Sequence, residues 1–299
     1  MSKIPVALFV YNRLSHTKAT ISALADNDLR DVVLYIFSDG PKGEDHNSVS
    51  SLRAYLHTIT GFEEIIIIKA STNKGLARSI IEGVNYIFET FETVIVLEDD
   101  LVVSKHFITY MRKSLHKYRD NQRVMSIAGY SYPLFDSSEN RVGDTYFLRL
   151  TTSWGWGTWR SSWGRFDKNP DRLINSFSRQ DIREFNLNNS ENYWNQVLNN
   201  HRGTLNTWAI FWYATVFENH GLTLFPRMSL VNNIGFDGSG TNCGVSNRFD
   251  VHLRQGEIDY LEDNVVENVF VREELERYLR ATRPKFISRI LSYLLRYFH

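Results

Sequence analysis

The sequence has little cysteine, no long apolar run and no excess of charge of either sign. A single cysteine, Cys243, excludes a disulfide framework or a cysteine-rich zinc module and fits a reducing compartment. No segment reaches the roughly 18 consecutive apolar residues of a membrane-spanning helix. The 34 basic residues balance the 34 acidic ones, so the basic excess of a general nucleic-acid binder is missing. We therefore expect a cytoplasmic globular protein that binds no nucleic acid.

The first hundred residues alternate between short apolar runs and amphipathic segments. The runs are too short for helices and rich in β-branched residues, which is typical of buried parallel strands. Strands are expected at 4–11, 32–37, 65–68 and 94–97, and helices at 15–28, 49–59 and 75–91. Strands that alternate with helices imply right-handed crossovers and a parallel sheet covered on both faces.

The pattern changes after residue 100, although no clean linker marks a boundary. Helices are expected at 107–118 and 208–219, strands at 124–128, 145–150 and 222–225, and irregular helices over 168–206. A tryptophan-rich stretch spans 153–163, and a glycine-rich polar loop spans 235–244. We expect an α/β domain over 1–271, with a parallel half (1–100) and a mixed half (101–271), followed by a helical tail (272–299).

Three adjacent carboxylates, Glu98, Asp99 and Asp100, follow the apolar run 94–97. In an open parallel sheet, ligands bind beyond the carboxyl ends of the strands. Adjacent carboxylates repel one another there and are costly to desolvate without a cation, and a divalent ion relieves that cost through oxygen ligands. A solvated turn that caps the next helix is the alternative, and we favour the metal site.

Polar residues also follow the other three strands. Asp39 is either a ligand-binding carboxylate or an ordinary Asp-Gly turn. Arg13 suits phosphate oxygens, although it could equally be a surface charge. Lys74 and Arg78 begin a helix, whose N-terminus favours an anion, but an ordinary turn has the same pattern. Together these positions predict a pocket for a diphosphate, a metal and a hydroxyl-rich group, which is a nucleotide-sugar site.

The motifs PVALFVYNR, FSDG, NKGLARS, VIVLEDDL, SWGWGTW and NIGFDGSGTN occur in an order that resembles GT-A-fold glycosyltransferases. The resemblance covers roughly residues 4–245. Within that fold, the chain is most similar to the N-acetylglucosaminyltransferase I type and to its bacterial relatives from polysaccharide and lipopolysaccharide gene clusters. It implies a metal-dependent, inverting transfer of a hexose or N-acetylhexosamine from a nucleoside-diphosphate sugar, UDP-linked, to a glycan or lipid-linked glycan hydroxyl.

The resemblance also implies roles for the residues at the nucleotide. Asp39 matches the acid that binds the uracil ring. Tyr11 and Arg13 match positions beside the nucleotide and its phosphates. Asp100 matches the carboxylate of a DXD-like motif that coordinates the metal directly, which is Mn²⁺ or Mg²⁺.

Further positions correspond to the donor sugar and the acceptor. Glu98 and Asp99 match contacts to the donor sugar and ribose, and Trp156 falls at the donor–acceptor junction. The tryptophans of 154–163 could instead be plain core, because aromatic rings both stack on sugars and fill interiors. Residues 235–246 match a segment that orders over the bound donor.

One departure concerns the catalytic base. Inverting members carry an acidic residue near the start of a helix, but the corresponding stretch 206–212 has no carboxylate. Glu191, Glu218 and Asp237 are possible replacements. A catalytically degenerate, transferase-like glycan-binding or assembly subunit therefore remains an alternative. A sugar nucleotidyltransferase is a weaker one, because its glycine-rich phosphate loop is missing after the first strand.

The tail, residues 284–299, combines a broad apolar face with basic residues. Such a helix suits an anionic membrane surface, which would place the protein peripherally at the inner face of the cell membrane. A helix docked on the protein body or on a second subunit would have the same pattern.

Overall fold

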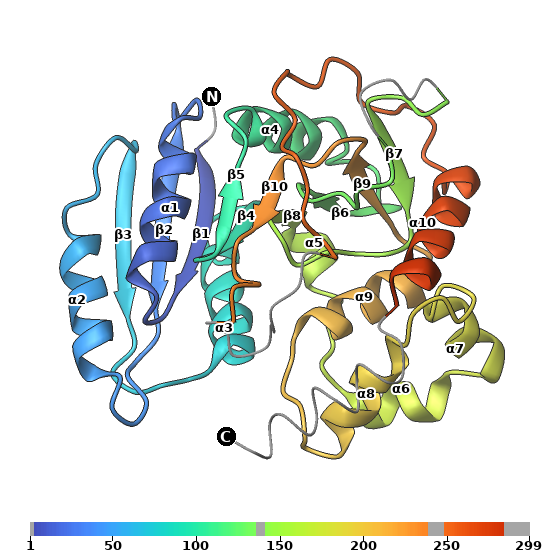
Figure 1. The fold of residues 1–299 in the computed structure, drawn as a ribbon, viewed down its shortest axis with the longest axis horizontal. Helices are drawn as coiled ribbons and strands as arrows, with labels where there is room; N and C mark the ends of the chain where they lie inside the picture. The colour runs from blue at the N-terminus through green and yellow to red at the C-terminus, as the bar shows by residue number, and fades with distance from the viewer. Residues whose placement is uncertain (1–2, 136–140, 239–247, 284–299) are drawn as a thin grey trace.

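The computed structural model describes residues 3–135, 141–238 and 248–283. Its main sheet contains β1 (Ile4–Val10), β2 (Val32–Ser38), β3 (Glu64–Lys69), β4 (Thr93–Glu98), β6 (Val124–Ala128), β7 (Thr145–Leu148), β8 (Trp156–Trp159) and β9 (Leu222–Pro226). Their order is β3-β2-β1-β4-β8-β6-β9-β7 (Figure 1). The first four strands pair in parallel, which confirms the predicted parallel half.

The second half of the sheet is mixed. Strand β8 pairs antiparallel with both β4 and β6, β9 pairs parallel with β6, and β7 pairs antiparallel with β9. The sequence did not predict β8, because the four residues Trp-Gly-Thr-Trp show no strand period. A separate two-stranded sheet joins β5 (Leu101–Val103) to β10 (Val231–Asn233), and it was also missed.

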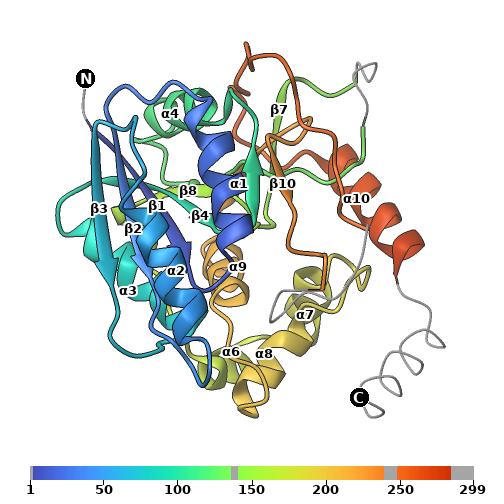
Figure 2. The ribbon, with the colours of Figure 1, turned by 60° about the vertical axis from the view of Figure 1, so that its left-hand side comes forward.

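Helices cover both faces of the sheet. The helices α1 (Leu14–Ala25), α2 (His46–Leu56) and α4 (Phe107–Lys117) share one hydrophobic cluster with β1 and β2. The helices α3 (Leu76–Phe88), α5 (Arg160–Trp163) and α9 (Ala209–Glu218) share another, on the opposite face. Figure 2 shows α1 and α2 lying side by side over the first strands. The strands are buried on both faces, which is why they lack polar alternation.

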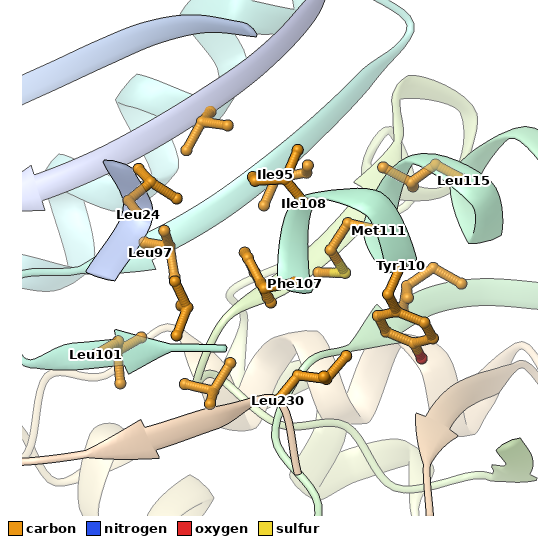
Figure 3. Packing of buried hydrophobic residues seen from close by; sticks show 14 of the residues in the cluster. Leu24, Ile95, Leu97, Leu101, Phe107, Ile108, Tyr110, Met111, Leu115 and Leu230 are labelled. Carbon is orange, nitrogen blue, oxygen red and sulfur yellow. The ribbon is translucent and has the colours of Figure 1, made fainter. Parts of the chain in front are cut away.

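Helix α4 shows how the amphipathic pattern becomes packing. Phe107, Met111 and Leu115 recur at helical spacing, so they share one face of α4. That face packs in the cluster that contains Ile95 and Leu97 of β4 (Figure 3). This contact fixes the end of β4, where the carboxylates begin.

A third hydrophobic cluster builds the second half of the molecule. It includes residues of α6 (Pro170–Ser176), α7 (Arg179–Phe185), α8 (Trp194–His201) and α10 (Val269–Thr282). In α10, Val271, Leu275 and Leu279 are buried, so the expected boundary at residue 272 falls inside a helix of this core. Within the described ranges, no helix combines the length and the hydropathy that a membrane span requires. Residues 284–299 lie outside the described residues, and their membrane contact stays a prediction.

Candidate functional site

Three charged side chains meet where β1 and β4 end. These strands are neighbours in parallel register, so Arg13, which precedes α1, lies beside the residues that follow Glu98. Arg13 Nη2 donates to Asp100 Oδ2 at 2.8 Å, and the same nitrogen bonds Asp99 Oδ1. Asp99 is 4% exposed and Asp100 is 7% exposed. The structure therefore brings Arg13 together with the carboxylates at the end of β4. We refer to Glu98, Asp99 and Asp100 as the acidic cluster.

The acidic cluster carries more negative charge than Arg13 neutralises. Burial raises the pKa of Glu98, and the neighbouring Asp100 and Asp99 raise it further. Burial also raises the pKa of Asp99, while the Arg13 guanidinium acts in the opposite direction. The Thr20 hydroxyl donates to the Asp99 carbonyl at 2.8 Å and ties the turn to α1. One guanidinium facing three carboxylates leaves an environment that favours a further cation.

The chain after β10 closes over this cluster. The Ile234 N–H donates to the Asp100 carbonyl at 2.9 Å. At Gly235, an added Cβ would lie 2.2 Å from Asp100 Oδ2, so the backbone touches the carboxylate. Two residues later, Asp237 Oδ2 lies 3.1 Å from Nε2 of His16, in α1. The first residues of the predicted donor-covering segment thus contact the acidic cluster, while 239–247 lie outside the described residues.

Asp39 organises two neighbouring loops. Its Oδ1 accepts the N–H groups of Gly40 and Lys74, each at 2.8 Å. Its Oδ2 accepts the Gly75 N–H at 2.9 Å and the Asn73 side-chain amide at 3.1 Å. Only glycine fits at residue 40, because a Cβ there would lie 2.3 Å from the Thr72 carbonyl carbon. The predicted contact of Asp39 with uracil stays a prediction, since the four lone-pair directions of the carboxylate already have partners.

Tyr11 lies between the same loops and the start of α2. Its hydroxyl donates to Asp45 Oδ2 at 2.5 Å and accepts the Lys42 N–H at 3.1 Å. Burial, followed by the hydrogen bond to Asp45, raises the pKa of Tyr11 to about 12. Tyr11 therefore lies at the expected strand end, although its hydroxyl is already hydrogen-bonded to the Asp45 carboxylate.

The two basic side chains expected to bind an anion at the start of α3 instead form ion pairs with a carboxylate of the protein itself. Lys74 Nζ lies 2.6 Å from Glu82 Oε2, and Arg78 Nε lies 2.5 Å from Glu82 Oε1. Both cations are exposed, so in the structure they form a solvated ion-pair group on the helix surface. The Lys74 backbone, rather than its ammonium group, reaches Asp39.

Trp156 is a core residue in this structure. It is 0% exposed and packs against Trp163, Trp208 and Trp212, with ring centroids 5.1 to 5.9 Å apart. Neither face of its ring is open to a sugar. Trp154 is the tryptophan beside the acidic cluster, because it packs against Phe236, which follows Gly235, at 5.5 Å. Sequence spacing could not separate the two residues.

The three candidate bases lie in different environments. Glu218 ends α9 and makes two hydrogen bonds to Arg172, at 2.8 and 2.7 Å. Glu191 accepts from Arg248 at 2.9 Å. Asp237 alone lies on the loop that contacts Asp100, and its side chain is 49% exposed. Its partner His16 could not be identified from the sequence, because residues 16 and 237 are far apart in the chain and no motif joins them.

The acidic cluster fits a divalent ion that is only partly held by protein. The available donors are carboxylate oxygens, which suit Mg²⁺ and Mn²⁺. Within the described ranges, no three His, Cys, Asp or Glu side chains are arranged to hold a metal by themselves. An ion at Asp100 therefore needs further oxygen ligands, as Mg²⁺ does when substrate phosphates complete its coordination.

A cavity of about 1100 Å³ lies elsewhere in the molecule. Its lining includes Ile4, Thr93 and Trp159, which are at the starts of β1 and β4 and the end of β8. This is the edge of the sheet opposite the acidic cluster. The cavity therefore forms no part of the candidate site.

Several solved structures resemble the chain weakly. A mannosyltransferase from Pyrobaculum calidifontis, solved with GDP-Man and Mn²⁺, has 8% identity and a TM-score of 0.43, over 73% of this chain and 69% of that one. Residues 1–349 of S. aureus TarS have 9% identity and a TM-score of 0.42, over 77% of this chain and 59% of that one. The same TarS residues solved with UDP give 12% identity and a TM-score of 0.33, over 48% and 38%. The chain thus spans under two thirds of the TarS fragment.

Comparison at the level of sequence gives the family. Among curated proteins, none matches the chain significantly. The family model for glycosyl transferase family 2 matches residues 6–177, which is more than half of the chain. The match includes residues 6–100 of the predicted parallel half, the acidic cluster and the tryptophan-rich stretch. The α/β sheet with helices on both faces is the GT-A fold expected from the motifs, and the chain belongs to glycosyl transferase family 2.

Proposed function

We propose that the protein is a metal-dependent, inverting glycosyltransferase that uses a nucleoside-diphosphate sugar, UDP-linked, and a glycan or lipid-linked glycan acceptor. The observation that carries this proposal is the buried Asp99–Asp100 pair joined to Arg13 at the ends of β1 and β4. Buried carboxylates in excess over their guanidinium partner favour a cation. Membership of glycosyl transferase family 2 supports transfer of a sugar as the reaction.

In this proposal the donor diphosphate lies over the acidic cluster. Asp100 would hold Mn²⁺ or Mg²⁺, and the bound ion would neutralise the leaving diphosphate. Arg13 would contribute forked N–H donors to phosphate oxygens. Glu98 and Asp99 would contact the sugar and the ribose. The loops organised by Asp39 would bind the uracil ring.

We assign the general base to Asp237. Its carboxylate is half-exposed, so an acceptor hydroxyl can reach it, and Gly235 on the same loop touches Asp100. The imidazole of His16, 11% exposed, holds the Asp237 carboxylate in place. Asp237 would take the proton of the acceptor hydroxyl as the oxygen attacks the sugar. Glu218 is a weaker candidate because its two hydrogen bonds to Arg172 occupy both oxygens.

An aromatic cluster beside this loop suits the acceptor. Trp154 packs against Tyr130, Phe236 and Phe249, with ring centroids 4.6 to 5.7 Å apart. Trp154, Phe236 and Phe249 are only partly buried. Aromatic rings pack against apolar faces of sugars, so this cluster would position a glycan next to Asp237.

The experiment is a screen of the full-length protein for donor turnover with and without Mn²⁺. We expect slow hydrolysis of one UDP-sugar that needs the metal, and faster release of UDP once the acceptor is present. Asp237→Asn should retain donor binding and lower acceptor-dependent turnover by about 10²-fold or more. The matched variant Glu218→Gln should retain turnover. Equal turnover in both variants would remove Asp237 from the reaction.

A second candidate function rests on α9. No acidic residue stands in the first turn of this helix, where the family's base was expected. A chain without a base would serve as a glycan-binding or assembly subunit. Donor binding with no turnover of any nucleotide sugar, under conditions where Asp237→Asn changes nothing, favours that alternative.

A further inference from the structure

Arg13 occupies the position that a cation at the acidic cluster would take. Its Nη2 is shared between Asp99 and Asp100, and its side chain is 19% exposed. Asp100 Oδ2 also faces the backbone of Gly235. Asp100 Oδ2, which could serve as a metal ligand, therefore already has a positively charged partner.

The other terminal nitrogen of Arg13 is left without a partner. Nη1 is buried and makes no hydrogen bond within the described residues. Leaving a buried N–H donor without an acceptor is destabilising, because the hydrogen bond it made to water is lost and not replaced. A guanidinium donates two parallel hydrogen bonds to a phosphate, so a diphosphate would satisfy the group better than the present arrangement does.

The backbone of Arg13 is fixed, so only its side chain is available to move. The Arg13 carbonyl accepts both the N–H and the hydroxyl of Thr17, each at 3.0 Å. These bonds hold the backbone of Arg13 at the start of α1, whichever partner its guanidinium has.

We propose that Arg13 is a displaceable counter-ion, which neutralises Asp99 and Asp100 in the free protein and moves to the diphosphate when the donor binds. This inference rests on the proposed function. Its consequence is an order of binding, in which free metal binds poorly and metal enters with the nucleotide. Since coupling is reciprocal, the metal raises nucleotide affinity by the same factor.

The test measures binding rather than turnover. Mn²⁺ affinity is determined by electron paramagnetic resonance of the free ion, with and without UDP, for the wild type, Arg13→Gln and Arg13→Lys. We expect UDP to tighten Mn²⁺ binding to the wild type at least about tenfold. Arg13→Gln should bind Mn²⁺ alone about tenfold more tightly than the wild type, and UDP should tighten it less. Arg13→Lys, which keeps the charge but loses the fork, should lie between the two.

A control removes the effect of net charge. Arg119 is exposed and pairs with Asp120, so Arg119→Gln deletes one positive charge and should leave Mn²⁺ affinity unchanged. If Arg13→Gln does not fold, Arg13→Lys decides. Mn²⁺ affinity that is no tighter in the folded Arg13 variants than in the wild type overturns the inference. If the wild type binds Mn²⁺ but no nucleoside diphosphate, the proposed function fails instead.

Discussion

Gly235 packs its backbone directly against the carboxylate of Asp100. A Cβ at residue 235 would lie 2.2 Å from Asp100 Oδ2 and 3.1 Å from the side-chain oxygen of Asn233. The contact joins the end of β4 to the loop after β10, which lie more than 130 residues apart in the chain. It also places Asp237, two residues further on, close to the acidic cluster.

This contact predicts a strong effect of a single methyl group. Gly235→Ala should displace either Asp100 or the loop, because overpacking of this kind costs about 1 to 3 kcal/mol. We expect Mn²⁺-dependent UDP affinity, measured by calorimetry, to fall at least tenfold. Gly256→Ala is the control, since a Cβ at residue 256 meets nothing within 4 Å. Unchanged affinity in Gly235→Ala would show that the loop moves freely away from Asp100.

Asp100→Ala should nearly abolish metal-dependent donor binding while the fold persists. Arg13 keeps its bond to Asp99, so its guanidinium is not left without a carboxylate partner. Calorimetric titration of UDP and Mn²⁺ measures the loss, and circular dichroism checks the fold. Asp120→Ala, on an exposed carboxylate paired with Arg119, should bind like the wild type. Wild-type affinity in folded Asp100→Ala would assign the metal to another residue.

Asp39→Asn should destabilise the protein as well as weaken nucleotide binding. Asparagine retains one accepting oxygen, whereas Asp39 accepts three backbone N–H groups and one amide. Leaving a buried donor without an acceptor costs about 1 to 3 kcal/mol. Urea denaturation measures the change. The exposed carboxylate Asp171 provides the control variant, Asp171→Asn. A stability equal to that of the control would mean that the loops rearrange without cost.

The two neighbouring tryptophans should respond differently to truncation. Trp156→Ala removes a fully buried ring and should cost about 3 to 5 kcal/mol of unfolding free energy. Trp154→Ala removes a partly buried ring beside Phe236 and should lower acceptor-dependent turnover more than stability. Thermal unfolding and turnover are measured on both variants. A stable Trp156→Ala with impaired turnover would return Trp156 to the sugar-binding site.

The raised pKa of Tyr11 predicts how the free energy of unfolding changes at alkaline pH. Its folded-state pKa is raised to about 12, above the ordinary value of about 10. The folded state therefore holds the proton more tightly, and this contribution is present below pH 10 and lost as the pH rises towards 12. In Tyr11→Phe, unfolding free energy should fall less steeply between pH 10 and 12 than in the wild type. Parallel curves for the two proteins would contradict the assignment.

Parts of the fold could be predicted from the residues because they depend on local patterns. The apolar runs before Asn12, Asp39 and Glu98 are continuous and short, which identifies strands buried on both faces. Helix-length segments between them predict that β1, β2 and β4 run parallel, whereas their order in the sheet comes from the structure. Strand β8 escaped prediction because Trp156 to Trp159 has no local strand signal and is held by β4 and β6 instead.

The residues at the strand ends were also predictable, since parallel strands bring their carboxyl ends to one edge. Arg13, Asp39 and Asp99 lie at the predicted strand ends for that reason. Their partners were not predictable. Asp39 bonds backbone groups of the loop before α3, and Lys74 pairs with Glu82 eight residues away, because the nearest partner in space decides each contact. Arg78 and Glu82 are an exception, since their i,i+4 spacing on one helix indicates the pair.

The sequence by itself determined the parallel half of the sheet and the acidic cluster at its edge, because both follow from short-range periodicity. Only the tertiary structure decided that Arg13 pairs with Asp99 and Asp100, that Gly235 closes on Asp100, and that His16 meets Asp237. These contacts join segments that are distant in the chain. Their geometry depends on how β10, α1 and β4 pack around a shared core, which no local pattern encodes.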